Sequence, residues 1–293
     1  MNLSTKIMYV VLLILAVGII LTVVSIWLSS FFINITKFNM RSKKIPKSFD
    51  NYKILQISDL HNKEFSKNNS RLLKKIDEIK PDIIVLTGDM VSANSKDFAL
   101  FFSLVDKLTN IYPVYYVFGN HEIKMDSQKQ IKLIEQINNS KLIFLRNEKI
   151  EITKDDKTIS LFGLEQPFKF YKNLLRKDKN VDFLLSDMEK IFSNINNEGF
   201  NILLSHSPFD FEVFAKWGAD LTLSGHVHGG LIRLPFIGGL ISPERGLFPK
   251  YSEGEYSIDD SKMIVSRGLG GSSGVNLRLF NNPEICVVTL KCD

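Results

Sequence analysis

Short apolar runs alternate with amphipathic segments in this chain, and the alternation limits the folds open to it. Residues 52–58 (YKILQIS), 82–87 (DIIVLT) and 113–118 (PVYYVF) have strand character. The apolar run in DIIVLT is continuous, which is typical of a strand covered on both faces. Residues 68–80 and 98–108 have the periodicity of helices. Strand–helix–strand repetition of this kind favours parallel strands joined by right-handed crossovers.

The second half of the chain has a different pattern. Residues 149–153 and 158–162 are strand-like and flank a DDK turn, which predicts a hairpin. A helix is expected at 182–194, and strands are expected at 201–205 and 221–224. Glycine-rich and strand-rich sequence follows to the end. The sequence therefore predicts an α/β fold in which two sheets pack face to face with helices outside, preceded by one transmembrane helix.

That transmembrane helix is predicted from residues 7–28, a run of 22 residues without a charge. Such a run is long enough to cross the hydrocarbon core of a bilayer as a helix. A secretory signal peptide is the alternative, but its apolar region usually has only about 7 to 15 residues, and no clear small-residue cleavage site follows this run. Residues 1–30 are thus expected to form an uncleaved membrane anchor.

The segment after the anchor, residues 31–51, is expected to be a basic juxtamembrane linker, with one catalytic domain at 52–293. Its positive side chains are Lys37, Arg41, Lys43, Lys44 and Lys47. The positive-inside rule then places the domain in the cytoplasm. The net charge of +5 is modest and partly lies in this cluster. It favours contact with anionic lipid headgroups over binding of nucleic acid.

Polar residues follow the predicted strands at the points where the strands end. They are Asp59 and His61, then Asp89, then Asn120, His121 and Glu122, then His206, and finally His226 and His228. All five histidines of the chain are in this set. In open α/β sheets, ligands bind in the crevice beyond the carboxyl ends of the strands. These side chains are therefore expected to share one site.

Each motif taken alone has an ordinary structural explanation. Asp-x-His and Gly-Asp occur in turns and helix caps, and the two histidines of the GHVH motif could be solvated in a turn. A lone His206 would more often be a core or capping residue than a ligand. The occurrence of all five motifs together instead favours a shared metal site. Imidazole, carboxylate and amide oxygen without thiolate form a ligand set that suits manganese, iron or zinc.

In this order, the motifs resemble those of the calcineurin-like metallophosphoesterase family. The chain has DLH at 59–61, GD at 88–89, GNHE at 119–122, His206, and GHVH at 225–228. The resemblance extends from about Tyr52 to the C-terminus. With the anchor, the segments GHVHGGLIRLPFIGG and SPERGLFPKY are similar to a membrane-associated bacterial branch that includes YkuE-type phosphodiesterases and UDP-diacylglucosamine pyrophosphatases.

The resemblance implies a centre of two divalent metal ions. One ion would be bound by Asp59, His61 and His228. The ligands of the other would be Asn120, His206 and His226. The carboxylate of Asp89 would bridge both ions, which fits the need for an anion between two cations about 3.5 to 4 Å apart.

The implied reaction is hydrolysis of a phosphodiester or pyrophosphate bond by metal-activated hydroxide. Asp89, Asn120 and His121 would be the catalytic residues. His121 would not bind metal, and as an imidazolium it would stabilise charge or protonate the leaving oxygen. Arg233, Arg245, Arg267 and the run GLGGSSG at 268–274 are candidates for the rim of the substrate pocket, with a solvated loop as the alternative.

The expected partners are the membrane and a phosphoester substrate, with a nucleotide-linked lipid as one option. Two other functions stay open. A nuclease of the same fold would need an electrostatic track for nucleic acid, and the catalytic region has no long basic stripe. A non-catalytic, metal-stabilised binding protein at the membrane would have no need of a histidine such as His121 that does not bind metal.

Overall fold

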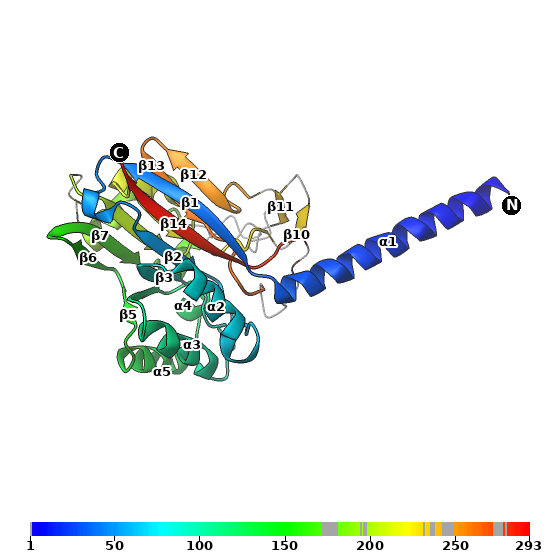
Figure 1. Ribbon diagram of the computed structural model, residues 1–293, viewed down its shortest axis with the longest axis horizontal. Helices are drawn as coiled ribbons and strands as arrows, with labels where there is room; N and C mark the ends of the chain where they lie inside the picture. The colour runs from blue at the N-terminus through cyan, green and yellow to red at the C-terminus, as the bar shows by residue number, and fades with distance from the viewer. Residues whose placement is uncertain are drawn as a thin grey trace.

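The fold consists of two six-stranded sheets packed face to face, with helices on their outer faces and one long helix that projects away (Figure 1). This computed structural model describes residues 2–171, 181–193, 195, 198–230, 232–234, 238–241, 249–271, 278 and 280–293. The predicted α/β fold with two packed sheets is confirmed.

The first sheet has the strand order β1-β14-β2-β3-β4-β5. Its strands are β1 (Asn34–Ser42), β14 (Glu284–Cys292), β2 (Lys53–Ile57), β3 (Ile83–Thr87), β4 (Val114–Val117) and β5 (Ile143–Phe144). Strands β2 to β5 are parallel, as the alternation of strands and helices predicted. Strand β14 is antiparallel to β2 and parallel to β1.

The second sheet has the order β12-β13-β9-β8-β7-β6. Its strands are β12 (Gly254–Ile258), β13 (Ser261–Val265), β9 (Leu221–Ser224), β8 (Asn201–Ser205), β7 (Lys157–Leu164) and β6 (Glu148–Lys154). The predicted hairpin is β6–β7, and strands β7, β8, β9 and β13 are parallel. A separate pair, β10 (Ile232–Leu234) and β11 (Gly238–Ile241), is antiparallel.

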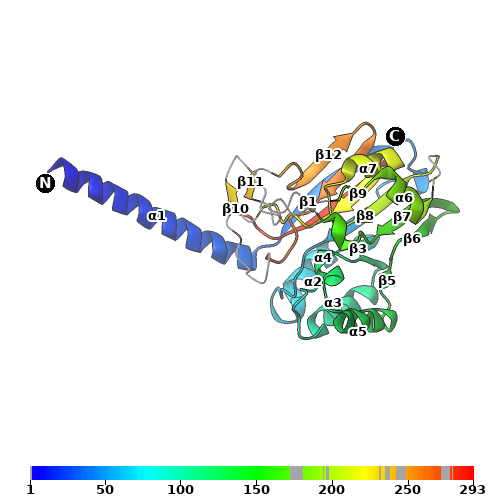
Figure 2. The same ribbon diagram turned by 180° about the vertical axis from the view of Figure 1, so that it is seen from behind.

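The helices cover the outer faces of the two sheets. On the first sheet lie α2 (Ser70–Ile79), α3 (Ala99–Thr109), α4 (Asn120–Ile123) and α5 (Ser127–Asn138), and on the second lie α6 (Leu185–Phe192) and α7 (Phe211–Trp217), as Figure 2 shows from behind. Short 3-10 turns occur at Lys47–Phe49, Lys67–Asn69 and Phe168–Phe170.

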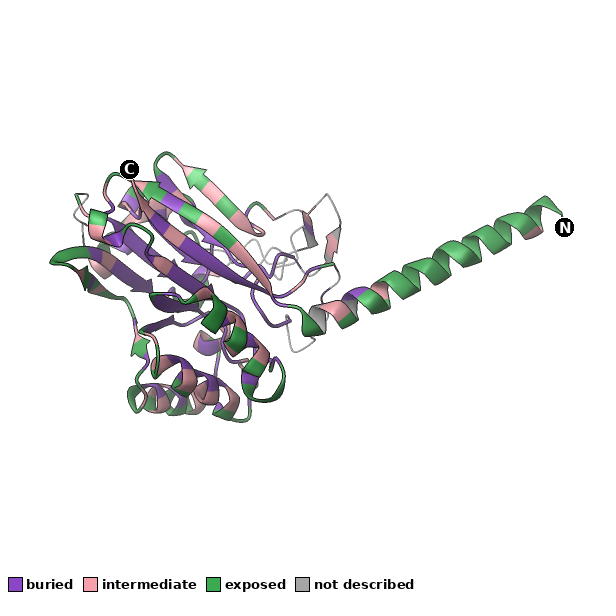
Figure 3. Cartoon of the chain, in the orientation of Figure 1, coloured by how far each residue is buried: buried purple, intermediate pink, exposed green. Residues whose placement is uncertain are grey.

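Alternate residues of the central strands enter different cores, because successive side chains of a strand point to opposite faces. In β3, Ile83 and Val85 pack between the two sheets, whereas Ile84 and Leu86 pack under α2 and α3. The outer face of the second sheet is closed by a third cluster that includes Phe162, Phe214 and Trp217. The strands in the middle of the sheets are buried on both faces (Figure 3) and hold the loops at their ends in place.

Several elements differ from the expectation. Residues 31–51, expected to be a linker, contain β1, which pairs with β14 from Asn34–Glu284 to Ser42–Cys292. The pairing of this strand could not be predicted, because its partner lies at the other end of the chain. Helices α4, α5 and α7 were not expected either. The side chain of Asp126 caps α5 by accepting a hydrogen bond from the Lys129 N–H.

The predicted apolar helix is α1 (Leu3–Phe31), of which Leu3–Ser25 is apolar and long enough to cross a membrane. Its side chains are almost all exposed, which distinguishes it from a core helix (Figure 3). A signal sequence near the N-terminus has the same length and composition.

Candidate metal centre

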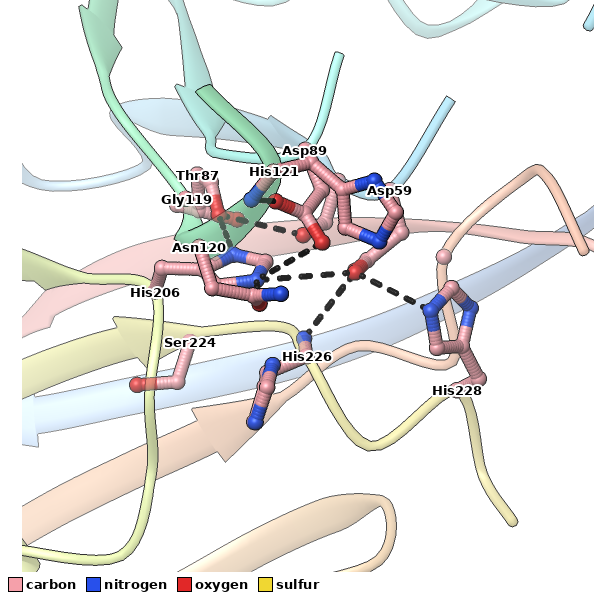
Figure 4. A network of polar contacts seen from close by, with 12 residues as sticks. Asp59, Thr87, Asp89, Gly119, Asn120, His121, His206, Ser224, His226 and His228 are labelled. Atoms are coloured by element: carbon pink, nitrogen blue, oxygen red, sulfur yellow. Dashed lines mark hydrogen bonds and ion pairs between the residues drawn. The ribbon is translucent and has the colours of Figure 1, made fainter. Parts of the chain in front are cut away.

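The loops after β2, β3, β4, β8 and β9 meet at one place and bring the predicted site residues together (Figure 4). Hydrogen bonds join these loops directly. The Asp59 N–H donates to Gly88 O at 3.0 Å, the Gly225 N–H donates to His206 O at 3.0 Å, and the His226 N–H donates to the carboxylate of Asp59 at 3.1 Å. The site is therefore built from segments that are up to 169 residues apart in the sequence, from Asp59 to His228.

The backbone at this site has an unusual conformation. Five of the site residues have a positive φ, between 48° and 74°: Asp59, His61, Asp89, His226 and His228. Residues other than glycine rarely adopt a positive φ. The strain of this backbone conformation is tolerated where the surrounding structure enforces it. The conformation turns each side chain inward directly after its strand, which is why Asp-x-His and His-x-His side chains converge here.

Asp59, His61 and His228 form the first group of possible metal ligands, whose ligating atoms lie within 4.8 Å of one another. The Nε2 atoms of His61 and His228 are 3.3 Å apart, and His228 Nε2 is 3.5 Å from Asp59 Oδ1. Burial lowers the pKa of His61 to about 3 and holds the pKa of His228 well below its ordinary value. Both rings are therefore neutral, which is the state in which imidazole binds metal.

The second group consists of Asp89, His206 and His226, with Asn120 beside it. His206 Nδ1 lies 2.7 Å from Thr87 O, and since a carbonyl only accepts, the proton is on Nδ1. This leaves Nε2 to face the site, 3.2 Å from Asp89 Oδ2 and 3.1 Å from Asn120 Oδ1. A ring held through its far nitrogen by a carbonyl is the arrangement that orients metal-binding histidines.

The electrostatics of the second group favour a positive charge at its centre. Burial lowers the pKa of His206, but the carboxylates of Asp89 and Asp59 outweigh burial and raise this pKa to about 10. His206 in turn holds the pKa of Asp89 well below the usual range against the effect of burial. Two buried carboxylates and several imidazoles thus fit the divalent cations that such donors bind.

Asp89 joins the two groups. Its Oδ2 atom lies 3.2 Å from His206 Nε2 (Figure 4) and 3.7 Å from His61 Nε2, so it contacts ligating atoms of both groups. The other carboxylate oxygen, Oδ1, accepts the His121 N–H at 2.8 Å. This bond holds the carboxylate in its orientation between the two groups.

His121 lies beside the centre without belonging to either group above. Its ring packs edge-on against His61 with centroids 4.6 Å apart, and a third possible ligand group combines it with His61 and Asp89. The Ala93 N–H donates to His121 Nδ1 at 3.2 Å. Nδ1 is therefore an acceptor, and the ring carries its proton on Nε2.

Glu122 belongs to the GNHE motif, but no role was predicted for it. It is fully buried and accepts four hydrogen bonds, from the N–H groups of Asp89, Val91 and Gly119 and from the Tyr116 hydroxyl, at 2.9 to 3.1 Å. It thereby ties the loop after β3 to the loop after β4. The available signal was its position as the third residue after Gly119, where a capping glutamate is common.

Glycines allow the loops to approach closely. A Cβ on Gly119 would collide with the Asp89 carboxylate, and one on Gly225 would collide with Ser58 and Asp59. At the start of the GLGGSSG run, the Leu269 N–H donates to Ser58 O at 3.0 Å and the Gly270 N–H donates to Asp59 O at 2.6 Å. This part of the run therefore supports the backbone of Asp59 and does not form a free rim.

Two of the predicted rim arginines are paired with carboxylates. Arg233 forms an ion pair with Glu253, and Arg267 contacts Glu253 at 3.2 Å and Glu284 through two nitrogens. Arg245 lies outside the described residues. On the open side of the centre, a surface pocket is lined by His121, Ser92 and Ala93 together with Asn94, Lys124, Asp126 and Lys129.

The order and geometry of these residues agree with a comparison of the sequence with protein families. Residues 52–230 match the model of the calcineurin-like phosphoesterases. The chain belongs to the calcineurin-like phosphoesterase family. It is thus a member of a family of metal-dependent hydrolases, and its clustered aspartate and histidine side chains are able to bind metal.

Three relatives of this phosphoesterase cover most of its length. Metallophosphoesterase YkuE of Bacillus subtilis is 29% identical over 271 residues, which are 90% of this chain and 88% of YkuE. UDP-2,3-diacylglucosamine pyrophosphatase LpxG of Chlamydia muridarum is 26% identical, covering 90% of this chain and 92% of LpxG. Phosphodiesterase YaeI of Escherichia coli is 26% identical, covering 82% of each chain. The similarity to the bacterial branch expected from the sequence is confirmed.

Proposed function

We propose that this phosphoesterase is a membrane-anchored hydrolase that uses two divalent metal ions to cleave a phosphodiester or pyrophosphate bond. The observation that carries the proposal is the position of Asp89 Oδ2, which contacts the ligating nitrogens of both His61 and His206. Asp59, His61 and His228 would bind one ion. Asn120, His206 and His226 would bind the other, with Asp89 shared between them.

The metal ions, which we propose to be manganese, iron or zinc, would lower the pKa of bound water and offset charge on phosphate. The residues of the chain set the charge state and the orientation of the ligands. Burial keeps His61 and His228 neutral, and Thr87 O orients the ring of His206. Asp89 is held in place by the His121 N–H, and Glu122 fixes the two loops that carry Asp89 and Asn120.

His121 would act by donating a hydrogen bond from Nε2. Because the Ala93 N–H donates to Nδ1, Nε2 is the ring nitrogen that can donate. This N–H can stabilise negative charge on a phosphoryl or leaving-group oxygen that enters the pocket beside it. The domain would comprise residues 52–293 together with β1, and α1 would anchor it with the basic residues on the cytoplasmic side.

The names of the relatives support a diester or a pyrophosphate as the substrate. LpxG is a UDP-2,3-diacylglucosamine pyrophosphatase and YaeI is a phosphodiesterase. A nucleotide-linked lipid is therefore a substrate class to test in this phosphoesterase, alongside water-soluble diesters.

The test is hydrolysis of bis-p-nitrophenyl phosphate by the detergent-purified chain with added manganese. Asp89→Asn should reduce turnover by more than about a hundredfold, because a neutral amide cannot hold two cations together. Asp155→Asn is a matched control, since Asp155 is an exposed turn residue with a similar positive φ. Equal turnover in the two variants would refute the proposal.

A further inference from the structure

An exposed aromatic ring lies at the corner where the apolar helix joins the domain. Phe280 is 39% exposed and has a φ of 52°, a backbone conformation that bulky residues rarely adopt. The end of α1 and the start of β14 meet at this corner (Figure 1). A strained residue that leaves an apolar ring exposed is a candidate for an external contact.

The apolar helix determines the level at which Phe280 lies. The Phe280 N–H donates to the hydroxyl of Ser25 at 2.7 Å, and Ser25 is the last residue of the apolar span. Lys6 lies 19 residues earlier in the same helix. At about 1.5 Å per residue the helix rises roughly 29 Å between them, close to the thickness of a hydrocarbon core, about 30 Å. In a bilayer crossed by α1, Ser25 and Phe280 therefore lie at one edge of the core.

Other side chains at this level suit the boundary between lipid and water. Trp27, Phe31 and Phe32 are exposed and follow Ser25 within roughly 10 Å along the chain. Tryptophan is enriched at this depth of membrane proteins, and phenylalanine is apolar enough to enter it. Arg71 donates from Nη1 to Phe31 O at 2.9 Å, and its guanidinium lies 5.3 Å from the centroid of the Phe31 ring. An arginine at the level of the headgroups is attracted to lipid phosphate.

The loop that carries Phe280 is braced on both sides. Asn281 donates to His228 O at 2.5 Å and to Gly230 O at 3.1 Å, and the Asn34 N–H donates to Pro283 O at 2.7 Å. Through the side chain of Asn281, the His228 carbonyl lies within roughly 10 Å of the Phe280 backbone. The loop thus links the apolar helix, the start of β1 and a residue of the first ligand group.

We propose that the loop at 280–283 is a membrane contact of the catalytic domain, in which the ring of Phe280 enters the lipid bilayer that α1 crosses. The proposal rests on the membrane anchoring proposed above and goes beyond it, because an anchor alone leaves the domain free to tilt. The second contact fixes the orientation of the domain. It holds the metal centre at a constant, short distance from the membrane surface.

Quenching of tryptophan fluorescence by doxyl-labelled lipids tests this contact in the full-length protein in phosphatidylcholine nanodiscs. The probe is Phe280→Trp in a Trp27→Phe background. Its signal is corrected with Trp27→Phe alone, in which the buried Trp217 remains. A doxyl group near the headgroup should quench the probe at least about half as strongly as it quenches Trp27 of the wild type. A doxyl group at the methyl end of the lipid chain should quench the probe less.

Ile143→Trp in the same background is the matched control. Ile143 is 37% exposed, but it lies in β5, at the opposite edge of the first sheet from β1, so lipid should not quench it. Quenching of Phe280→Trp no stronger than that of Ile143→Trp would overturn the membrane contact. If lipid also failed to quench Trp27, the anchoring itself would be refuted. Neither outcome depends on hydrolysis, so the proposed reaction is judged separately.

Hydroxyl-radical footprinting of the unaltered protein gives a second measurement that needs no substitution. Phe280 and Ile143 are exposed to similar extents in the absence of lipid. After correction for intrinsic reactivity, Phe280 should be oxidised at least about fivefold more slowly than Ile143 in nanodiscs, because the bilayer excludes water from its ring. Equal rates would contradict the contact. Slow oxidation of Phe280 without lipid quenching of the probe would show that protein, such as a second copy of the chain, covers the ring, and would also overturn it.

Discussion

At the scale of single residues, the metal centre depends on a carboxylate that does not face it. Glu122 uses both oxygens to accept four hydrogen bonds, three from backbone N–H groups and one from Tyr116. Burial and the neighbouring Asp89 raise its pKa to about 7, so its contacts compensate a large cost of desolvation. It sets the relative positions of Asp89 and Asn120, which come from different loops.

Glu122→Gln should destabilise the protein and weaken the metal centre. The amide NH2 would face two donors and leave them unsatisfied, which should lower the free energy of unfolding by about 2 to 4 kcal/mol. Thermal unfolding and manganese titration of activity measure the two effects. Glu151→Gln is the control, since Glu151 is exposed and pairs with Lys149, and it should change stability by less than about 1 kcal/mol. An unchanged Tm in Glu122→Gln would contradict the role assigned to Glu122.

At the scale of elements, strands β1 and β14 pair with each other, and one buried carboxylate links this pair to the loop that supports Asp59. Glu284, the first residue of β14, accepts from Thr36 of β1 at 2.5 Å, from the Arg267 N–H at 3.1 Å and from Arg267 Nε at 3.0 Å. Burial opposes ionisation, but Arg267 outweighs it and lowers the pKa of Glu284. The contact joins β1, β14 and the loop that supports Asp59.

This lowered pKa predicts a loss of stability in acid. A carboxyl group whose pKa is lower in the folded state stabilises that state above its unfolded value, about 4.3, and the contribution is lost as the pH falls below that value. Wild-type stability should therefore fall more steeply between about pH 5 and pH 3 than that of Glu284→Gln, which should be less stable at pH 7 by about 2 kcal/mol or more. Chemical denaturation across this range measures both. Parallel curves for the two proteins would contradict the assignment.

At the scale of the whole molecule, the apolar helix is attached close to the metal centre. Ser25, the last residue of the apolar part of α1, is buried, and its hydroxyl accepts the Phe280 N–H at 2.7 Å. The next residue, Asn281, donates to His228 O and to Gly230 O. Arg71 Nη1 donates to Phe31 O at 2.9 Å. One loop thus contacts both the helix and the backbone of a proposed metal ligand.

Membrane anchoring by α1 predicts how the full-length protein fractionates. It should sediment with membranes, resist extraction by alkaline carbonate and high salt, and be released by detergent, because about 20 apolar residues have to leave the bilayer. The intact mass should include residue 1 or 2. Carbonate extraction of the protein, or a mature N-terminus after the apolar run, would instead identify a signal sequence.

The sequence was informative where local patterns determine structure. Strands 82–87 and 201–205 and the histidines that follow strands were predictable, because apolar runs and polar strand ends are local features. The pairing of strand β1 was not predictable, because its partner β14 is far away in the sequence. Asn34 of β1, for example, pairs with Glu284, 250 residues later. The hydrogen bonding of Glu122 could not be predicted, because it depends on which loops meet in space.

The central claim is that Asp89 is shared by two metal ions. Anomalous diffraction from crystals of the manganese-loaded protein tests it most directly. Our account predicts two peaks, one contacted by Asp59, His61 and His228 and the other by Asn120, His206 and His226, with Asp89 touching both. A single peak, or two peaks of which Asp89 contacts only one, would contradict it.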